Sequence, residues 1–204
     1  MQAWQPVCNL DFSTLQTVPL QLETVYCDSP SLHTAQRKIV PAPNGVRLEN
    51  GSLQFVDSRQ AFGEHGLLVT RWTEPIGGDV AIEVDVAAGE PWSIGVSVDG
   101  DSFEGYRIIF IAPNYPNGIN VDSIYPVEAT LLAQDPRPIT TEQDHTLRVE
   151  KRGPQLRVWV DQELRIDTQL SCPLAPNRRQ TFAISSFGTG PQIRALRVWE
   201  GGGD

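Results

Sequence analysis

Hydrophobic and polar residues alternate with a two-residue period along HTLRVEKRGPQLRVWVDQELRID, residues 145–167. Such a period places one set of side chains on a buried face of a strand and the other set on the opposite face. A first corner is expected at Gly153, which tolerates a positive φ, before Pro154, which suits the start of a strand. The pair Asp161-Gln162 predicts a second corner, so the segment is expected to form a β-meander.

The same alternation recurs along much of the chain. Asn50-Gly51 joins two short alternating runs and is the pair preferred in a two-residue hairpin turn. The run at 104–113 is almost continuously apolar, which indicates a central strand covered on both faces. Strands are further expected at 7–13, 67–72, 79–87, 92–98, 129–133, 181–187 and 192–200. About ten to thirteen strands with almost no helical period predict an all-β protein.

Length and composition favour one domain over residues 1–204. The chain has 204 residues, of which 40% are hydrophobic and 20% charged, which suits one large β-sandwich. Residues 1–44 are expected to be irregular apart from one paired strand, with a long surface excursion from Thr14 to Pro43. The segment 113–138 is expected to be mostly loop, apart from the strand near 129–133.

The net charge and the hydropathy of the chain narrow the classes of partner that the protein is expected to bind. The formal net charge of -9 disfavours nucleic acid and anionic lipid, and no run of Lys or Arg exceeds two residues. No apolar stretch is long enough for a membrane span, so no membrane insertion is expected. No secretory signal is recognisable, which leaves a cytoplasmic protein and a mature or excised secreted domain both open. Oligomeric state is left open.

Three cysteines do not form a disulfide framework. A bridge between Cys8 and Cys27 is one alternative for an exported protein, and three buried thiols, including Cys172, are the other. Zinc is not expected, because the cysteines are far apart and the three histidines are dispersed.

The order of strand motifs resembles the concanavalin A-like lectin/glucanase superfamily. The motifs are an N-terminal DF strand, the NGSLQF hairpin, EVDV, GYRIIF, the meander and the final SFGTGPQIRALRVW. Within the superfamily, the chain looks most like bacterial laminin-G-like and 3-keto-disaccharide-hydrolase-type domains. Their meander commonly has Asp-Gly at its second corner, whereas this chain has Gln162 after Asp161.

The resemblance implies a jelly-roll sandwich of two curved antiparallel sheets, with the last strand beside the first. It also implies a protein associated with an oligosaccharide or polysaccharide, which binds or acts on a glycan at a concave face or its rim. Two alternatives are a 3-keto-glycoside hydrolase-type enzyme and a non-catalytic interaction or structural module. Whether the protein is an enzyme is left open, and no catalytic residue is assigned.

Glu83-Val84-Asp85 invites comparison with the Glu-x-Asp-x-x-Glu strand of glucanases in this superfamily. The third acid of that motif would fall at Ala88, so the catalytic set is absent. Retaining glycoside hydrolysis needs two carboxyl groups about 5 Å apart. We therefore expect Glu83 and Asp85 to be solvent-facing strand residues, and any enzyme activity to use another mechanism.

Candidate ligand-binding residues are aromatic and polar side chains on the predicted outward faces and loops. Flat rings stack on sugar rings, and neighbouring polar groups bond the hydroxyls. The strand Trp92–Val98 also presents Ser-Gly-Ser on the face opposite the expected core residue Trp92, which leaves room for a ligand. The expected ligand-binding residues are Trp159, Arg157, Arg148, Tyr115, Tyr125, Asp122 and His65.

Two further expectations concern histidine and calcium. His65 lies near Glu64 and offers acid–base chemistry, whereas His145, at the start of a strand, is expected to be structural. Calcium is a possible cofactor, because acidic turns at Asp99-Gly100-Asp101 and at 117–122 offer oxygen ligands. Ordinary turn chemistry explains the same residues without a metal.

Overall fold

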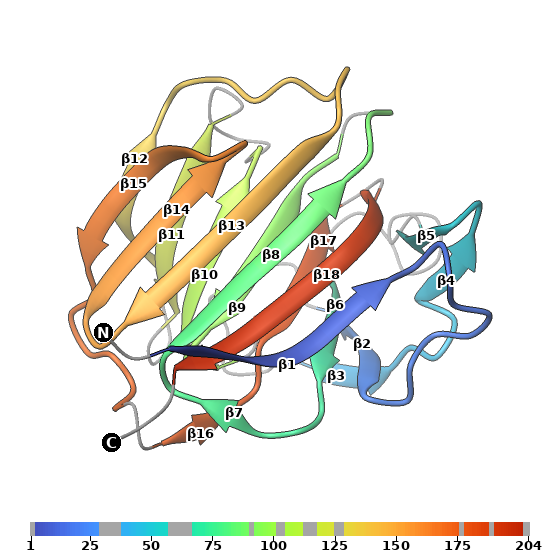
Figure 1. Ribbon diagram of the computed structural model, residues 1–204, viewed down its shortest axis with the longest axis horizontal. Coiled ribbons are helices and arrows are strands. Elements are labelled where there is room, and N and C mark those ends of the chain that lie inside the picture. Colours follow the sequence, from blue (N-terminus) through green and yellow to red (C-terminus); the bar gives the residue numbers. More distant parts are fainter. Residues whose placement is uncertain are drawn as a thin grey trace.

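The computed structural model describes residues 3–28, 38–56, 67–89, 92–100, 105–111, 118–124, 129–175, 178–187 and 190–201. In this part of the chain the regular elements are strands, arranged as two large antiparallel sheets and one small sheet (Figure 1). No helix among these residues is long and apolar enough to cross a membrane.

Sheet A contains both ends of the described chain. Its strand order is β15 (Glu163–Gln169), β14 (Gln155–Val160), β13 (His145–Arg152), β8 (Val80–Val86), β18 (Gln192–Gly201), β5 (Ser52–Phe55) and β4 (Val46–Glu49), and β1 (Trp4–Asp11) also pairs with β18. The first strand therefore runs beside the last, as the resemblance implied.

Sheet B packs against sheet A. Its strand order is β12 (Ala129–Asp135), β11 (Ile119–Ile124), β10 (Tyr106–Phe110), β9 (Ile94–Val98), β17 (Ala183–Phe187), β6 (Leu67–Trp72), β2 (Leu22–Asp28) and β3 (Lys38–Pro41). A two-stranded sheet of β7 (Ile76–Gly77) and β16 (Arg179–Gln180) lies at one end.

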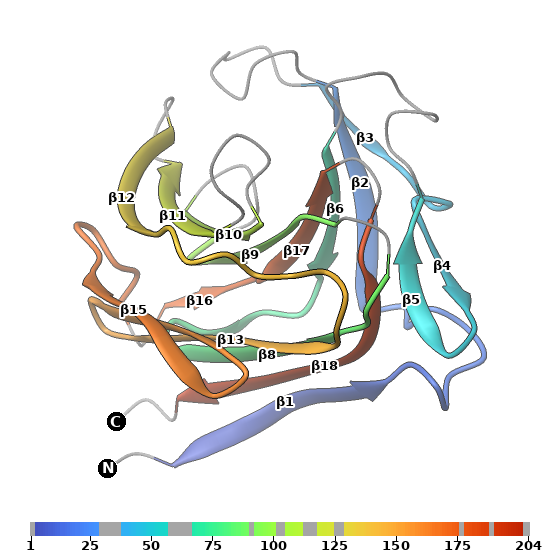
Figure 2. The same cartoon turned by 90° about the horizontal axis from the view of Figure 1, so that it is seen from above.

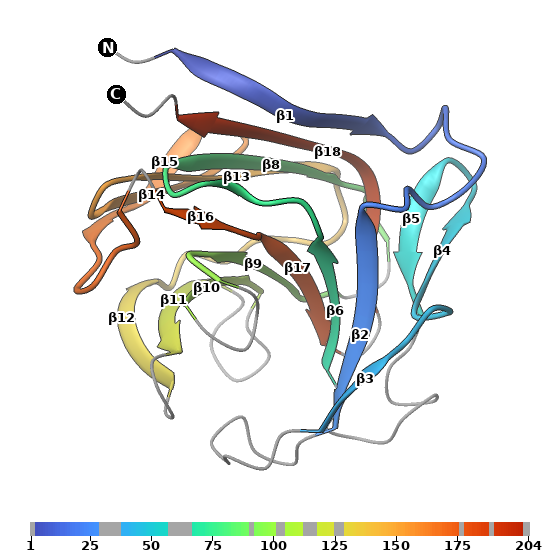
Figure 3. The same ribbon diagram turned by 90° about the horizontal axis from the view of Figure 1, so that it is seen from below.

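Sheet B is strongly bent. Figures 2 and 3 show β12 on one side and β2 with β3 on the other side curving away from sheet A, so the outer face of sheet B is concave. The hydrophobic core lies between the two sheets and includes Ile82 and Val149 from sheet A, and Val96 and Ile108 from sheet B. The jelly roll of two curved antiparallel sheets is thus confirmed.

The local predictions from alternation are largely confirmed. The meander forms β13, β14 and β15, with positive φ at its corner residues Gly153, Asp161 and Gln162. The hairpin residues Asn50 and Gly51 also have positive φ. All five residues of β10 are buried, in agreement with a central strand covered on both faces.

Two expectations about irregular segments were wrong. The excursion expected from Thr14 to Pro43 contains β2, which pairs with β6 through Glu23 and Val25, and β3 beside it. The segment expected to be mostly loop contains β11, paired with β10 on one side and with β12 on the other. The strands β2 and β11 belong to the bent sheet and pack side chains on both faces. Their sequences therefore lack the clear alternation of apolar and polar residues that marks a strand with one face in water.

The cysteines depart from the expectation of three buried thiols. Cys8 is a partly buried free thiol, and burial raises its pKa to about 12, whereas Cys172 is exposed. The side chain of Cys27 lies outside the described residues. A thiol with so high a pKa is protonated at neutral pH and is a poor nucleophile.

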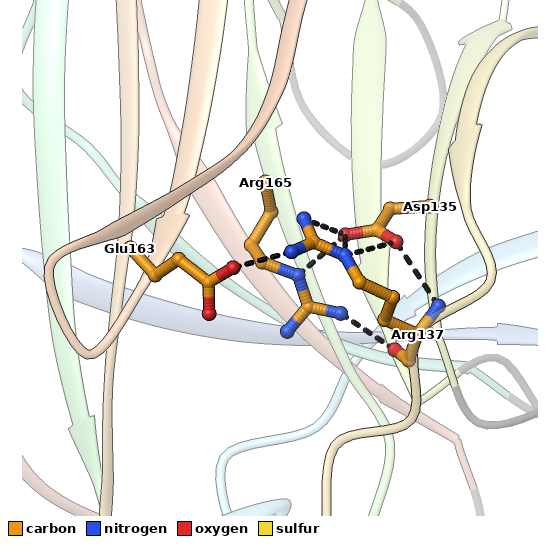
Figure 4. A network of polar contacts seen from close by, with 4 residues as sticks. All are labelled: Asp135, Arg137, Glu163 and Arg165. Atoms are coloured by element: carbon orange, nitrogen blue, oxygen red, sulfur yellow. Dashed lines mark hydrogen bonds and ion pairs between the residues drawn. The ribbon is translucent and has the colours of Figure 1, made fainter.

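One side of the sandwich is closed by a polar cluster between the edge strands β12 and β15 (Figure 4). The carboxylate of Asp135 accepts bonds from the backbone N–H and guanidinium of Arg137 and from the guanidinium of Arg165. Arg137 also reaches Glu163, and Arg165 donates to the carbonyl of Arg137 at 2.6 Å. These bonds join an edge strand of each sheet.

Candidate functional site: the concave face of sheet B

Strand alternation determines which side chains reach the concave face. In β9 and β10, Val96 and Ile108 point into the core, so Ser97 and Arg107 point to the opposite, concave side. The pairing registers then align these side chains in two adjacent rows that cross the sheet.

The first row, called here the charged row, has an ion pair near each end. It runs across six strands through Glu23, Arg71, Ala183, Ser97, Arg107 and Asp122. Arg71 bonds Glu23 at 2.7 Å, and Arg107 Nη2 lies 3.5 Å from Asp122 Oδ2. The small residues Ala183 and Ser97 separate the two arginines, which stand three strand spacings apart, about 14 Å along the sheet.

The second row is neutral and runs through Val25, Val69, Ser185, Gly95, Ile109 and Asn120. Steric crowding explains the glycine at position 95, because a Cβ there would lie 2.4 Å from Ser185 Oγ and 3.4 Å from Arg107 Cδ. The Ser-Gly-Ser face predicted to leave room for a ligand therefore belongs to the floor of the concave face.

Asn120 supplies a buried polar atom with no partner. Its side chain is 3% exposed, and no described donor lies within hydrogen-bond distance of its Oδ1. Buried polar atoms are nearly always bonded to protein, water or a ligand. The amide oxygen is thus an unsatisfied polar atom enclosed beneath the concave face.

The electrostatic environment is unusual at the end of the charged row that holds Arg107 and Asp122. Burial raises the pKa of Asp122, and the neighbouring Arg107 offsets this only in part. The guanidinium of Arg107 is 2% exposed. This end of the charged row is therefore an enclosed cation beside a carboxylate that holds its proton more readily than usual.

Of the predicted ligand-binding residues, the structure places Asp122 alone, among those it describes, on the concave face. Arg148, Arg157 and Trp159 lie on the outer face of sheet A, where Trp159 is directly opposite Arg148 in the register. That face points away from sheet B, so these residues do not join the concave rows (Figure 2). Tyr115, Tyr125 and His65 lie outside the described residues.

The outer face of sheet A carries its own network. Arg197 bonds Glu83 at 2.9 Å and Asp85 at 2.7 Å, and Arg148 reaches Glu83 at 3.3 Å while its guanidinium lies over Trp199. Arg157 pairs with Asp167 at 3.2 Å. The two acids compared with the glucanase motif are therefore paired strand residues, as expected.

The concave face lacks the acid pair for direct hydrolysis among its described residues. Its two described carboxylates in the charged row, Glu23 and Asp122, are five strand spacings apart, about 24 Å along the sheet. Inverting and retaining mechanisms need carboxyl separations of about 5–10 Å.

His145 has a structural environment. Its Nδ1 lies 2.7 Å from Asp161 Oδ2 and its Nε2 lies 2.7 Å from the carbonyl of Thr140. The ring is buried and meets Trp92 edge to face. One ring nitrogen thus binds the second corner of the meander and the other binds the segment before β13, which supports the expectation of a structural role.

The calcium expectation does not fit the described parts of the acidic turns. The Asp99 carboxylate accepts bonds from the backbone N–H of Leu174 at 2.7 Å and from Gln180 at 3.2 Å, and it lies 3.0 Å from the Lys151 ammonium. Asp122 is paired with Arg107. No group of three acidic, histidine or cysteine side chains in the described ranges is arranged to hold a metal.

A separate hollow of about 400 Å³ lies beside β2 and β3. Its lining is mainly aliphatic side chains and prolines, including Val18, Leu20, Pro41 and Val46, with Glu23 as the charged member. Such a lining offers few partners to hydroxyl groups, so the hollow fits a glycan less well than the two rows do.

Comparisons of the sequence with protein families and with curated proteins find no match. Solved structures are similar in fold. A LamA enzyme variant from Z. galactanivorans, in complex with laminaritriose and laminaritetraose, is 12% identical with a TM-score of 0.63, over 97% of this chain and 100% of that chain. The exoplasmic/lumenal domain of VIP36, bound to Ca²⁺ and Man3GlcNAc, is 15% identical with a TM-score of 0.56, over 78% of this chain and 82% of that one.

The Emp46p carbohydrate recognition domain, in a potassium-bound form, is 13% identical with a TM-score of 0.54, over 77% of this chain and 86% of that chain. At these identities the likeness establishes the fold alone, a jelly roll of two curved antiparallel sheets. The finer resemblance to laminin-G-like and 3-keto-disaccharide-hydrolase-type domains stays a prediction.

Sequence reasoning missed most of the concave rows. Arg107 was hidden in the almost continuously apolar run of β10, where one arginine among aliphatic residues was the available signal. Arg71 and Glu23 meet only because β2 pairs with β6, a contact between segments 48 residues apart.

Proposed function

We propose that the protein binds a glycan on the concave face of sheet B, across the charged row and the neutral row. The observation that carries this proposal is the row of hydrogen-bonding side chains that crosses the bent sheet and reaches solvent at Arg71 and Glu23. Solved structures of the same fold include complexes with laminaritriose and with a mannose-containing glycan, which supports a glycan as the partner.

The chemistry of the rows fits an extended, uncharged oligosaccharide. The partly exposed Arg71 donates to hydroxyl oxygens and the partly exposed Glu23 accepts from hydroxyl hydrogens, whereas Arg107 and Asn120 are buried. The small residues Ala183, Ser97 and Gly95 in the middle of the face are buried, so a ligand meets the face at its exposed end beside Arg71 and Glu23. Charges within the row are balanced by pairs, so no net charge is demanded of the ligand.

Binding without cleavage is the form of this function that the geometry favours, since the described carboxylates of the face are too far apart to cooperate. The 3-keto-glycoside hydrolase alternative rests on strand order alone. The candidate surface formed by Trp159, Arg157 and Arg148 remains a second location for a ligand, because Trp159 is partly exposed. The same experiment distinguishes the two faces.

The test is calorimetric titration of a broad oligosaccharide panel against the wild type, Arg71→Ala and Arg157→Ala. The two arginines are matched, because each pairs with one carboxylate and each is partly exposed, at 33% and 42%. Loss of a hydrogen bond from a charged donor should weaken binding about tenfold or more in Arg71→Ala. Arg157→Ala should bind as the wild type does.

The reverse pattern would move the site to the outer face of sheet A. Equal binding by both variants would refute both placements. If no glycan binds the wild type, the interaction-module alternative takes precedence. Thermal melts of each variant establish that it is folded before its affinity is compared.

A further inference from the structure

The hollow of about 400 Å³ opens where β3 leaves the side of β2. β3 pairs with β2 as far as Pro41, which lies opposite Val25 in the register. The chain then runs from β3 toward β4, away from β2 (Figure 3). The start of β2 therefore extends beyond the end of β3, and its residues Leu22, Glu23 and Thr24 all line the hollow.

Apolar side chains form most of the walls. The turn before β2 contributes Val18, Pro19 and Leu20, and the segment from β3 to β4 contributes Pro43 and Val46. Leu20 is 96% exposed, so its side chain is available to a ligand. The volume lies within the range of small-molecule sites, about 300–1,000 Å³, which are lined mainly by hydrophobic groups with a few polar ones.

Glu23 is the charged residue of the lining, and it also stands at one end of the charged row. Its Oε2 accepts from Arg71 Nε at 2.8 Å and lies 2.7 Å from Arg71 Nη2. No described residue donates to Oε1, and the Glu23 side chain is 43% exposed. Arg71 thus holds the carboxylate in place, and Oε1 is an acceptor for a hydroxyl group beside an apolar hollow.

We propose that the ligand is a glycan with an apolar substituent, an aryl or alkyl group, which occupies the hollow while a sugar hydroxyl donates to Glu23. This inference rests on the proposed glycan function and names the class of glycan. The hollow is continuous with the exposed end of the charged row, because Glu23 belongs to both. One ligand therefore reaches the apolar walls and the carboxylate together.

Two other occupants fit the lining less well. An unsubstituted oligosaccharide brings hydroxyl groups to walls of leucine, valine and proline side chains, which cannot bond them. An apolar side chain from a second copy of this protein would remove water from the Glu23 carboxylate without giving a donor in return. A ligand with one apolar end and one hydroxylated end satisfies both parts of the site.

The test is calorimetric titration of the wild type with methyl, butyl and hexyl glycosides of glucose, galactose and mannose. Each methylene that enters the hollow should tighten binding about fourfold. Affinity should therefore rise from the methyl to the hexyl glycoside in at least one of these sugar series. Methyl butyl ether, which has no hydroxyl group, should bind much more weakly than the butyl glycosides.

Two exposed leucines give a matched pair of variants. Leu20 lines the hollow, whereas Leu164 lies on β15 of sheet A and is 45% exposed. Leu20→Asp should remove most of the gain with alkyl length, and Leu164→Asp should keep it. Glu23→Gln keeps the shape of the side chain without its charge, so it should weaken all members of a series by a similar factor and keep the gain with length. Thermal melts establish that each variant is folded.

The outcomes separate this inference from the glycan proposal. Affinity that does not rise with alkyl length, or a rise that persists in Leu20→Asp, overturns the inference and leaves the glycan function standing where oligosaccharides bind. Methyl butyl ether that binds as tightly as the butyl glycosides, with no effect of Glu23→Gln, overturns both the inference and the glycan function at Glu23. A wild type that elutes as a dimer in size-exclusion chromatography, while Leu20→Asp elutes as a monomer, assigns the hollow to a second copy and overturns the inference too.

Discussion

Arg107 on β10 faces Asp122 on β11 across one strand spacing, with 3.5 Å between Nη2 and Oδ2, on the concave side of sheet B. The guanidinium is almost fully buried, while the carboxylate side chain keeps 14% of its surface exposed. This buried ion pair at one end of the charged row links the stability of the bent sheet to its candidate ligand surface.

Replacing Asp122 by Asn tests that link. The substitution removes the negative charge beside Arg107, so the buried cation loses a partner and the free energy of unfolding should fall by about 1–3 kcal/mol at pH 7. Urea unfolding measures the change. Ser123→Ala, on the same strand but outside both concave rows, serves as a control with a smaller expected loss.

The same variant reports on pH. Burial raises the pKa of Asp122 above its ordinary value, so the folded state takes up a proton at a higher pH than the unfolded state. A raised carboxyl pKa costs stability above the folded pKa, and that cost disappears as the pH falls toward the ordinary value. The stability deficit of Asp122→Asn should therefore be smallest at neutral pH and grow toward about pH 4, because only the wild type loses this cost as the pH falls. A deficit that stays constant over this range would contradict the raised pKa.

Glu83→Gln should leave any glycan binding or turnover within a few-fold of the wild type. Glu83 lies on the outer face of sheet A, where Arg197 and Arg148 hold it, and the motif position Ala88 supplies no third acid. Its partly exposed ion pairs predict a loss of stability of about 1 kcal/mol at most. A hundredfold loss of a glycan-directed activity in folded Glu83→Gln protein would restore the glucanase mechanism.

Features of this structure that depend on neighbouring residues could be predicted from the sequence, whereas features that depend on distant strand pairing could not. The meander and the Asn50-Gly51 hairpin were predictable, because alternation and turn residues act over a few positions. The strand β2 was not, since both of its faces are engaged: Leu22 faces the core, and Val25 belongs to a small buried cluster with Val69 on the concave side.

The candidate site depended on long-range pairing. Asp122 was singled out from its sequence, but Arg71 and Ala183 reach the same row only through strand pairs far apart in the chain. Parity correctly put Trp159 on the face opposite the aliphatic residues. Parity could not reveal that this face belongs to sheet A and that the concave face belongs to sheet B, because that depends on how the sheets bend.

Asp135→Asn should weaken the closure between β12 and β15. Burial alone would raise the pKa of Asp135, but hydrogen bonds from Arg137 and Arg165 outweigh it and hold the pKa well below its ordinary value. Stability from this carboxylate is therefore present above the unfolded pKa of about 4 and is lost as the pH falls through the lower folded pKa. We expect Asp135→Asn to lose about 2 kcal/mol at pH 7, largely through the buried Arg165, because Arg137 is exposed and screened.

Acid unfolding followed by circular dichroism measures this effect. The difference between the wild type and Asp135→Asn should shrink below about pH 4, where the carboxylate of the unfolded chain takes up a proton while that of the folded protein still holds its charge. Asp144→Asn is a matched control, since Asp144 also has a lowered pKa but is an exposed residue that bonds Ala88 N–H and Arg194. An equal loss in both variants at pH 7 would show that burial of the Asp135 cluster adds nothing.

Gln162→Gly should stabilise the protein. Asp161 and Gln162 form the corner between β14 and β15 with φ of 50° and 70°, a left-handed conformation that costs a residue with a Cβ about 1 kcal/mol relative to glycine. The Gln162 side chain is exposed, and its replacement removes no hydrogen bond that the structure describes. Asp161 must stay, because its carboxylate accepts bonds from the backbone N–H of Thr146 and from His145.

We expect a gain of about 0.5–1 kcal/mol in the free energy of unfolding, offset slightly by the greater freedom of glycine in the unfolded chain. Urea unfolding of Gln162→Gly beside Gly153→Ala gives opposite signs, since the second change places a Cβ at φ of 53°. A loss of stability in Gln162→Gly would mean that the glutamine side chain contributes more to this corner than its backbone strain removes.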